Sequence, residues 1–147
     1  MYNNFWYLEQ HRNGFRGLLP SLLGVERRLD APLRRLLERH AWPPTRIQDV
    51  LAAVREACLN AVEHGNGTQP EFVVTVSAEL LTEHLLRVCI TDQGTGLTPP
   101  PRPSLHLGWK VIQAFSQHAR LYSDRQTHQT TAELLFQRRE IEACRGG

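Results

Sequence analysis

The 147-residue sequence contains few cysteines and almost no lysine. Cys58, Cys89 and Cys144 are widely spaced, form no CxxC pair and have no histidine beside them at metal-ligand spacing. A disulfide framework or a zinc site is therefore not expected. Lys110 is the single lysine and does not end a GxxxxGK sequence. This excludes a Walker-type phosphate-binding loop.

Long apolar runs are also absent. No stretch approaches the roughly 18 apolar residues that a membrane span needs. The N-terminus, MYNNFWYLEQHR, has no basic segment followed by an apolar one. We therefore expect a cytoplasmic protein with no membrane partner, and the unpaired cysteines fit a reducing compartment. The formal net charge of +2 does not favour nucleic acid as a direct partner.

The composition that remains is that of an ordinary globular chain, with 41% hydrophobic and 22% charged residues. At this length, folding buries roughly 70% of the surface of the unfolded chain, which is enough for one core. We expect a single domain over residues 1–147. Residues 1–13 fit a strand, an arm or a dimer contact, and residues 138–147 are expected to form a tail.

The first half of the chain predicts a strand and two helices. A short apolar segment over residues 15–19 is followed by helical spacing over residues 22–37, which Pro32 should kink or divide because proline lacks an amide donor. A second helix should begin at Thr45 as its N-cap. Gly65-Asn66-Gly67 should end this helix, because these residues tolerate positive φ.

The second half predicts four strands and one more helix. Residues 72–80 and 86–90 alternate with period two and are joined by a short turn, which indicates an antiparallel hairpin. A helix is expected near residues 107–115, and strands over 119–123 and 130–137. This order predicts an α+β two-layer sandwich, with helices packed on one face of a mixed, mostly antiparallel sheet.

Three polar residues stand out against this pattern. Glu56 and Asn60 lie four residues apart on the second helix and point away from its apolar stripe. A solvated polar face would explain the pair, although Asn is unfavourable inside a helix. Asp92 continues the inward phase of its strand. A carboxylate there needs a hydrogen-bond donor from the protein or from a ligand.

Further candidates lie near the ends of other elements. Gly94 and Gly96 follow Asp92, where they permit a tight turn or a close approach to a ligand. Gly108 stands at the start of the third helix, where free amides form an anion site. Thr130 shares the inward phase of the last strand, so its hydroxyl needs a partner.

Four segments occur in a recognisable order: EACLNAVEHG, ITDQGTG, LGWKVI and QTTAELLF. Together they resemble the ATP-binding motifs of the GHKL superfamily, which has the Bergerat fold. The compact length and the ExxxNAxxHG helix are most similar to the anti-sigma-factor serine kinases of bacterial partner switching. The resemblance covers about residues 15–137.

This resemblance implies ATP and Mg²⁺ as cofactors. It implies that Asn60 holds the Mg²⁺ ion and that Asp92 accepts a hydrogen bond from the adenine amino group. Gly94 and Gly96 would shape the adenine pocket, and Thr130 would support Asp92 through water.

The resemblance also assigns a catalytic role. Glu56 would orient or deprotonate the attacking serine hydroxyl, in a reaction that depends mainly on positioning and charge stabilisation. At the phosphate end the family usually has Gly-x-Gly, whereas this chain has His106-Leu107-Gly108. His106 would either obstruct the phosphates or donate a hydrogen bond to them.

The expected function is that of an anti-sigma-type protein serine kinase. Such a protein binds a sigma factor or a similar regulator, phosphorylates a small anti-sigma-antagonist domain and commonly forms a homodimer. The alternative is a partner-binding module that nucleotide controls without phosphoryl transfer. A nucleic-acid binder using the Arg-rich first helix is a weaker alternative.

Overall fold

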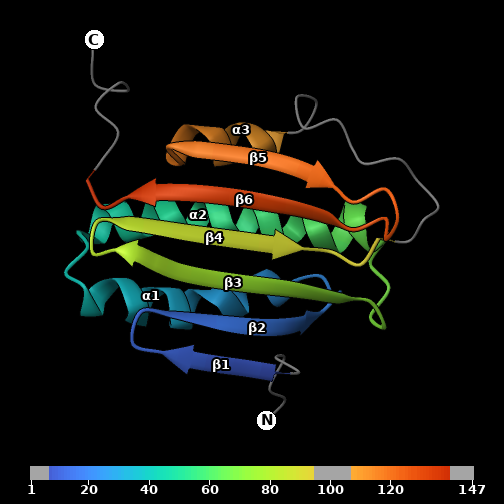
Figure 1. Ribbon diagram of the computed structural model, residues 1–147, viewed down its shortest axis with the longest axis horizontal. Helices are drawn as coiled ribbons and strands as arrows, with labels where there is room; N and C mark the ends of the chain where they lie inside the picture. Colours follow the sequence, from blue (N-terminus) through green and yellow to red (C-terminus); the bar gives the residue numbers. More distant parts are fainter. Residues whose placement is uncertain (1–6, 95–106, 140–147) are drawn as a thin grey trace.

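The computed structural model describes residues 7–94 and 107–139. Six strands form one sheet in the order β1-β2-β3-β4-β6-β5 (Figure 1). Their bounds are β1 Tyr7–His11, β2 Gly14–Pro20, β3 Val73–Thr82, β4 Leu85–Thr91, β5 His118–Ser123 and β6 Thr130–Gln137. The segment 7–11, for which the sequence allowed three interpretations, is thus an edge strand paired with β2.

The sheet is more uniform than the sequence suggested. All five neighbouring pairs of described strands are antiparallel, whereas a mixed sheet was expected. The reason lies in the last hairpin. Strand β5 runs in the same direction as β4, but β6 lies between them and pairs with both. The antiparallel return of β6 therefore separates the two strands that would have formed a parallel pair.

The helices cover one face of this sheet, which confirms the predicted α+β two-layer arrangement (Figure 1). They are η1 Val25–Leu29, α1 Asp30–Arg39, α2 Pro44–Asn60, the π-helical turn η2 Ala61–Gly65, and α3 Leu107–Phe115. The period of two in the strands directs alternate side chains toward the helices. Val74, Val76 and Ala78 of β3 are buried there, as are Leu86, Val88 and Ile90 of β4.

Prolines explain how the first two helices differ from expectation. The helix divides between η1 and α1, and Pro32 lies in the first turn of α1, where a missing amide costs no intrahelical bond. Thr45 was expected to be the N-cap of the second helix. Instead Pro43 is the N-cap and Pro44 is the first helical residue, because its fixed φ already suits that position.

The third helix lies at the predicted residues, and two of its side chains are buried against the core. Trp109 and Ile112 are buried, whereas Val111 and Phe115 are only half-buried. The inward positions of α3 therefore begin at Trp109. This places the indole of Trp109 between the helix layer and the sheet.

Arg46 fastens the far end of α3 to the rest of the fold. Its side chain is fully buried at the start of α2. It donates hydrogen bonds to the carbonyl oxygens of Phe115, at 2.8 Å, and Gln137, at 2.8 Å. It also donates to the Gln117 side chain at 2.8 Å and forms an ion pair with Asp49 at 3.3 Å. One guanidinium thus links α2, α3 and the end of β6.

We expect Arg46→Ala to lower the free energy of unfolding by about 3 kcal/mol, because it removes a fully buried guanidinium and leaves the part-buried carbonyl oxygens of Phe115 and Gln137 without this donor. Urea unfolding followed by circular dichroism measures this loss. Arg16→Ala is the matched control, since Arg16 is exposed on β2, and its effect should stay within about 0.5 kcal/mol. Equal effects of the two substitutions would contradict the proposed linking of α2, α3 and β6 by Arg46.

Candidate functional site

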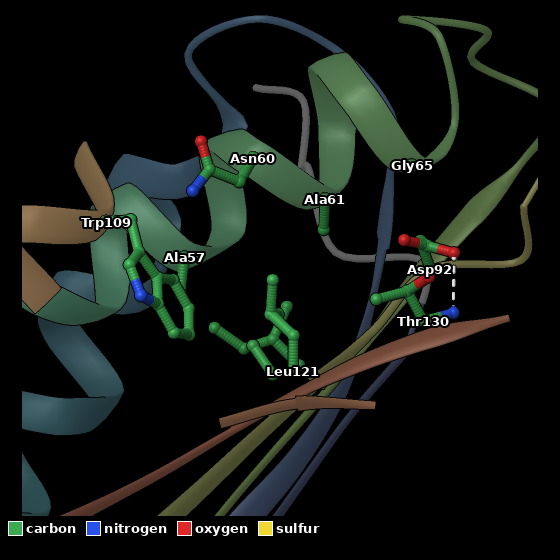
Figure 2. Close-up of a pocket in the computed structure, with 10 residues that line it drawn as sticks. Ala57, Asn60, Ala61, Gly65, Asp92, Trp109, Leu121 and Thr130 are labelled. Atoms are coloured by element: carbon green, nitrogen blue, oxygen red, sulfur yellow. Dashed lines mark hydrogen bonds between the residues drawn. The ribbon is translucent and has the colours of Figure 1, made fainter. Parts of the chain in front are cut away.

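A cavity opens between α2, η2 and α3 on one side and the sheet on the other (Figure 2). Most of its lining is apolar, and two polar side chains, Asn60 and Asp92, face it together with Thr130. The remaining lining residues are Ala57, Ala61, Gly65, Ile90, Trp109, Leu121 and Ala132. Apolar walls with a few placed polar groups are typical of a small-molecule site.

Asp92 is the buried polar group of this cavity. It directly follows β4, continues the inward phase of Ile90 and is only 4% exposed. Its Oδ1 accepts a hydrogen bond from the backbone amide of Thr130 at 3.1 Å, drawn as a dashed line in Figure 2. Burial raises the pKa of Asp92 to about 6, because the apolar surroundings disfavour its charge, although the Thr130 amide opposes this shift.

Gly65 lets the helical backbone approach this carboxylate. A Cβ atom at position 65 would overlap the carboxyl group of Asp92. Gly65 is the last residue of η2, the π-helical turn that continues α2. Such turns often occur at functional sites, and this one brings the helix end against the loop after β4. The sequence predicted the helix end here but not the π-helical turn.

Glu56 and Asn60 occupy successive turns of α2 but face different surroundings. Asn60 lines the cavity. Glu56 lies at the start of α3, where a Cβ atom on Gly108 would come within 2.5 Å of its Oε2. Glu56 also lines a second, polar pocket, together with Glu26, Arg27, Asp30, Arg55 and Leu59. Both side chains are half-buried, so each remains accessible to a ligand.

Thr130 contacts Asp92 more directly than the resemblance implied. The backbone amide of Thr130 donates to the carboxylate of Asp92, and the amide of Asp92 donates to the carbonyl oxygen of Thr130 at 3.0 Å. The hydroxyl of Thr130 shares a hydrogen bond of 3.0 Å with that of Ser123. Support of Asp92 by this hydroxyl through water stays a prediction.

The expected glycines and the phosphate segment are described only in part. Gly94 has a φ of 71°, which suits glycine, and its amide donates to the Asn66 side chain at 3.1 Å. Gly96 and His106 lie outside the described residues. Leu107 begins α3, and its side chain is likewise outside them. Gly108 follows at the helix start, beside Glu56.

Sequence reasoning missed a buried polar pair behind the loop that follows β4. Asn66 and Ser21 are both fully buried. The Asn66 amide group donates to the Ser21 hydroxyl at 2.8 Å, and its Oδ1 accepts from the amides of Gln93 and Gly94. Asn66 was expected only to end the helix through positive φ, but its φ is −106°. Positive φ occurs instead at Gly67 and Thr68.

This arrangement suits a flat heterocycle that carries an amino group. A buried carboxylate accepts hydrogen bonds, and the apolar walls favour a planar ring. The side-chain oxygen of Asn60 could be a ligand of Mg²⁺. This ion usually binds only one or two protein oxygens and keeps several water molecules. Among the residues described, no three His, Cys, Asp or Glu side chains group into a metal site. If Asn60 held a Mg²⁺ ion, it would supply one oxygen ligand, and the oxygens of a bound phosphate and of water would supply the others.

Comparison with known families identifies the class of this domain. Residues 19–133, more than half of the chain, match the family described as the histidine kinase-like ATPase domain. The chain belongs to that family, which confirms the resemblance to GHKL ATPases. The family implies ATP binding, and the cavity lies within the matched residues.

A curated relative shares only part of its length with the chain. It is the sensor protein NarQ homolog of Haemophilus influenzae, 32% identical over 69 residues. The match covers 47% of this chain and 12% of the relative. The chain thus spans a small part of that protein.

Several solved bacterial structures share this fold. One is the structure of the RsbU and RsbW domains of Rv1364c from Mycobacterium tuberculosis, with 25% sequence identity and a TM-score of 0.65. The match covers 84% of this chain and 32% of the Rv1364c chain. The SiaB–SiaC complex of Pseudomonas aeruginosa is 16% identical, with a TM-score of 0.56 and 91% coverage of both chains. A histidine kinase domain from Erythrobacter litoralis has a TM-score of 0.53 at 18% identity, covering 80% of this chain and 61% of that one.

Within residues 7–94 and 107–139, every helix is too short or too polar to cross a membrane.

We expect Asp92→Asn to stabilise the protein above pH 6. The folded state raises the pKa of Asp92 to about 6, so ionisation of the buried carboxyl costs stability as pH rises from about 4 to 6. The amide variant does not ionise, so its free energy of unfolding at pH 7 should exceed that of wild type by about 2 to 3 kcal/mol, the equivalent of a pKa raised by about two. Urea unfolding at pH 4 and pH 7 measures the difference between variant and wild type.

That difference should be large at pH 7 and small at pH 4. Glu71→Gln, at an exposed position before β3, is the control, and as an exposed substitution it should stay within about 0.5 kcal/mol of wild type. An Asp92→Asn difference that is equal at both pH values would contradict the cost of ionisation.

Proposed function

We propose that this domain binds ATP with Mg²⁺ and transfers the γ-phosphoryl group to a serine hydroxyl of a protein. The observation that supports this most is the grouping around α2 and α3. Asp92 lies buried in the cavity, Asn60 lines the same cavity one helical turn beyond Glu56, and Glu56 lies against the start of α3. Along α2 and η2, Glu56, Asn60 and Gly65 thus follow one another in chain order, and Gly65 abuts the carboxylate of Asp92, which follows β4.

Each residue has a defined task in this proposal. Asp92 accepts the adenine amino hydrogen, and Gly65 leaves room for the carboxylate beside the helix. Asn60 supplies the oxygen for Mg²⁺, which neutralises charge on the phosphates when bound. The backbone amides of the first turn of α3 would favour the phosphate anions.

Glu56 acts on the acceptor. As the serine oxygen bonds to the γ-phosphorus, the bond from that phosphorus to the oxygen of ADP breaks, and the serine proton passes to the Glu56 carboxylate. The second pocket, which Glu56 also lines, gives the acceptor a route to this carboxylate outside the cavity.

The proposed protein partners are a small antagonist domain as phosphate acceptor and a sigma factor or a similar regulator as binding target. The likeness to the structure with RsbU and RsbW domains supports a signalling role of this kind. A second protein with this fold, from Pseudomonas aeruginosa, was solved in a two-protein complex, SiaB–SiaC. A homodimer, a cytoplasmic location and action of residues 1–147 as one unit belong to the same proposal.

A second candidate function is nucleotide-controlled partner binding without phosphoryl transfer. It is favoured by His106, which stands where the family usually has a glycine beside the phosphates. The two functions differ in whether a phosphoserine forms.

We expect Mg²⁺-ATP to raise the thermal stability of the protein. A ligand that binds only the folded state adds about 2.7 kcal/mol at 100 times its Kd. Differential scanning calorimetry with millimolar ATP, with and without Mg²⁺, measures this shift. Asn60→Ala should remove most of the Mg²⁺ dependence, whereas Gln48→Ala, an exposed amide on the same helix, should retain it. A melting temperature that neither ATP nor ADP moves would refute nucleotide binding.

We expect Glu56→Gln to abolish phosphoryl transfer while nucleotide affinity stays within about twofold of wild type. The reason is that Glu56 acts on the attacking hydroxyl and lies outside the lining of the cavity. The assay uses labelled ATP and a purified antagonist domain, with phosphoserine identified by mass spectrometry. Glu63→Gln, an exposed glutamate further along the chain, should transfer normally.

Three outcomes separate the candidates. Transfer by wild type and by Glu63→Gln but not by Glu56→Gln supports the kinase. Transfer by Glu56→Gln at the wild-type rate contradicts the role of Glu56. Binding of nucleotide and partner by wild type without any phosphoserine leaves the partner-binding module as the function.

A further inference from the structure

Asn66 uses its whole hydrogen-bonding capacity inside the protein. Its side chain is fully buried directly after η2. Its Nδ2 donates to the Ser21 hydroxyl at 2.8 Å and to the carbonyl oxygen of Val73 at 3.2 Å. Its Oδ1 accepts from the amides of Gln93 at 2.9 Å and Gly94 at 3.1 Å. Two donors and two acceptor sites are all that an amide side chain has.

These bonds join four segments that are far apart in the sequence. Ser21 follows β2, Asn66 follows the helix, Val73 begins β3, and Gln93 and Gly94 follow β4. Ser21 in turn donates to the carbonyl oxygen of Phe72 at 2.7 Å. Because every member has a partner and the centre is buried, the network rigidifies this end of the sheet.

The part of the network that matters for a ligand is the loop after β4. The pairing of β4 with β3 and β6 ends at Thr91. Beyond Thr91, the amide of Asp92 still donates to Thr130, and the next two amides donate to Asn66. Asp92 is therefore held on one side by β6 and on the other by Asn66.

We propose that Asn66 is a positioning residue that gives this site its preference for adenine over guanine. This inference rests on the proposed ATP binding. Adenine presents an amino donor where guanine presents a carbonyl oxygen. A fixed carboxylate accepts from the first and repels the second, but a carboxylate that is free to move aside loses this discrimination. Asn66 prevents that movement by anchoring the backbone immediately after Asp92.

The test measures the ratio of the affinities for Mg²⁺-ATP and Mg²⁺-GTP by isothermal titration calorimetry. It uses the full chain at a temperature where circular dichroism shows each variant folded. Asn66→Ala removes the acceptor of two amides, so the ratio should fall about tenfold, the equivalent of one lost hydrogen bond. Ser21→Ala is the matched control. It removes a buried partner of Asn66 but keeps both amide bonds, so it should lose stability and keep the ratio.

Asn66→Asp separates positioning from general support of the fold. Its carboxylate still accepts from Gln93 and Gly94, but it cannot donate to Val73 or Ser21. We expect it to be less stable than wild type and yet to keep the wild-type ratio. Two results overturn the inference. One is an ATP-to-GTP affinity ratio that falls in proportion to the free energy of unfolding across the three variants. The other is an Asn66→Ala variant with the wild-type ratio. If Asn66→Ala does not fold, Asn66→Ser takes its place, because its single hydroxyl is too short to accept from both the Gln93 and the Gly94 amides. A fall of the ratio in Asn66→Ser supports the inference, and an unchanged ratio overturns it.

The same measurements distinguish a failure of the proposed ATP binding from a failure of the role of Asn66. A wild-type protein that binds neither nucleotide refutes ATP binding itself. A wild-type protein that prefers ATP, with an Asn66→Ala variant of equal preference, refutes only the role of Asn66.

Discussion

The burial of one carboxylate at the end of a central strand is the constraint on which this site depends. Asp92 continues the inward phase of β4, where a charged group loses its hydration. The fold meets this cost only in part, through the backbone amides of Thr130 and Gly94, and the absence of a side chain at Gly65 leaves room for the carboxylate. A carboxylate that faces an apolar cavity has acceptor sites beyond those its backbone partners use, so it can also accept a hydrogen bond from a ligand.

Helix α2 sets the distances around that carboxylate. Arg46 at its start fastens the end of α3 and the end of β6. Glu56 meets the beginning of α3, Asn60 lines the cavity, and the π-helical turn then brings Gly65 to Asp92. Both ends of α3 therefore contact α2, the first through Glu56 and the last through Arg46. A displacement of the N-terminal end of α3 would therefore change its contact with Glu56, because Arg46 holds the other end.

Most of the fold could be predicted from the sequence, because its main signals are periodic. The alternation in residues 72–80 and 86–90 indicated the central hairpin, and the spacing of apolar residues indicated α2. The end of α2 and the inward phase of Asp92 also followed from local patterns. The α+β class followed from the order of these elements.

What could not be predicted depends on contacts between distant segments. The position of β6 between β4 and β5 is decided by pairing, which no local pattern encodes. The hydroxyl of Thr45 favours this residue as the N-cap of α2, but the fixed φ of Pro44 determines the helix start. The role of Arg46 was hidden because an arginine early in a helix usually faces water.

Asn66 shows the same limit at the site itself. In the sequence it is a residue between two glycines, and such a residue most often forms a turn. Its function as a buried anchor exists only because Ser21, Val73 and Gly94 converge on it from three other segments. The residues that contact a ligand are marked by local chemistry, whereas the residues that hold them in place are defined by the tertiary structure. For this reason, the motifs indicated the site through Asp92 and Asn60, but the geometry that would make the site selective became visible only in the fold.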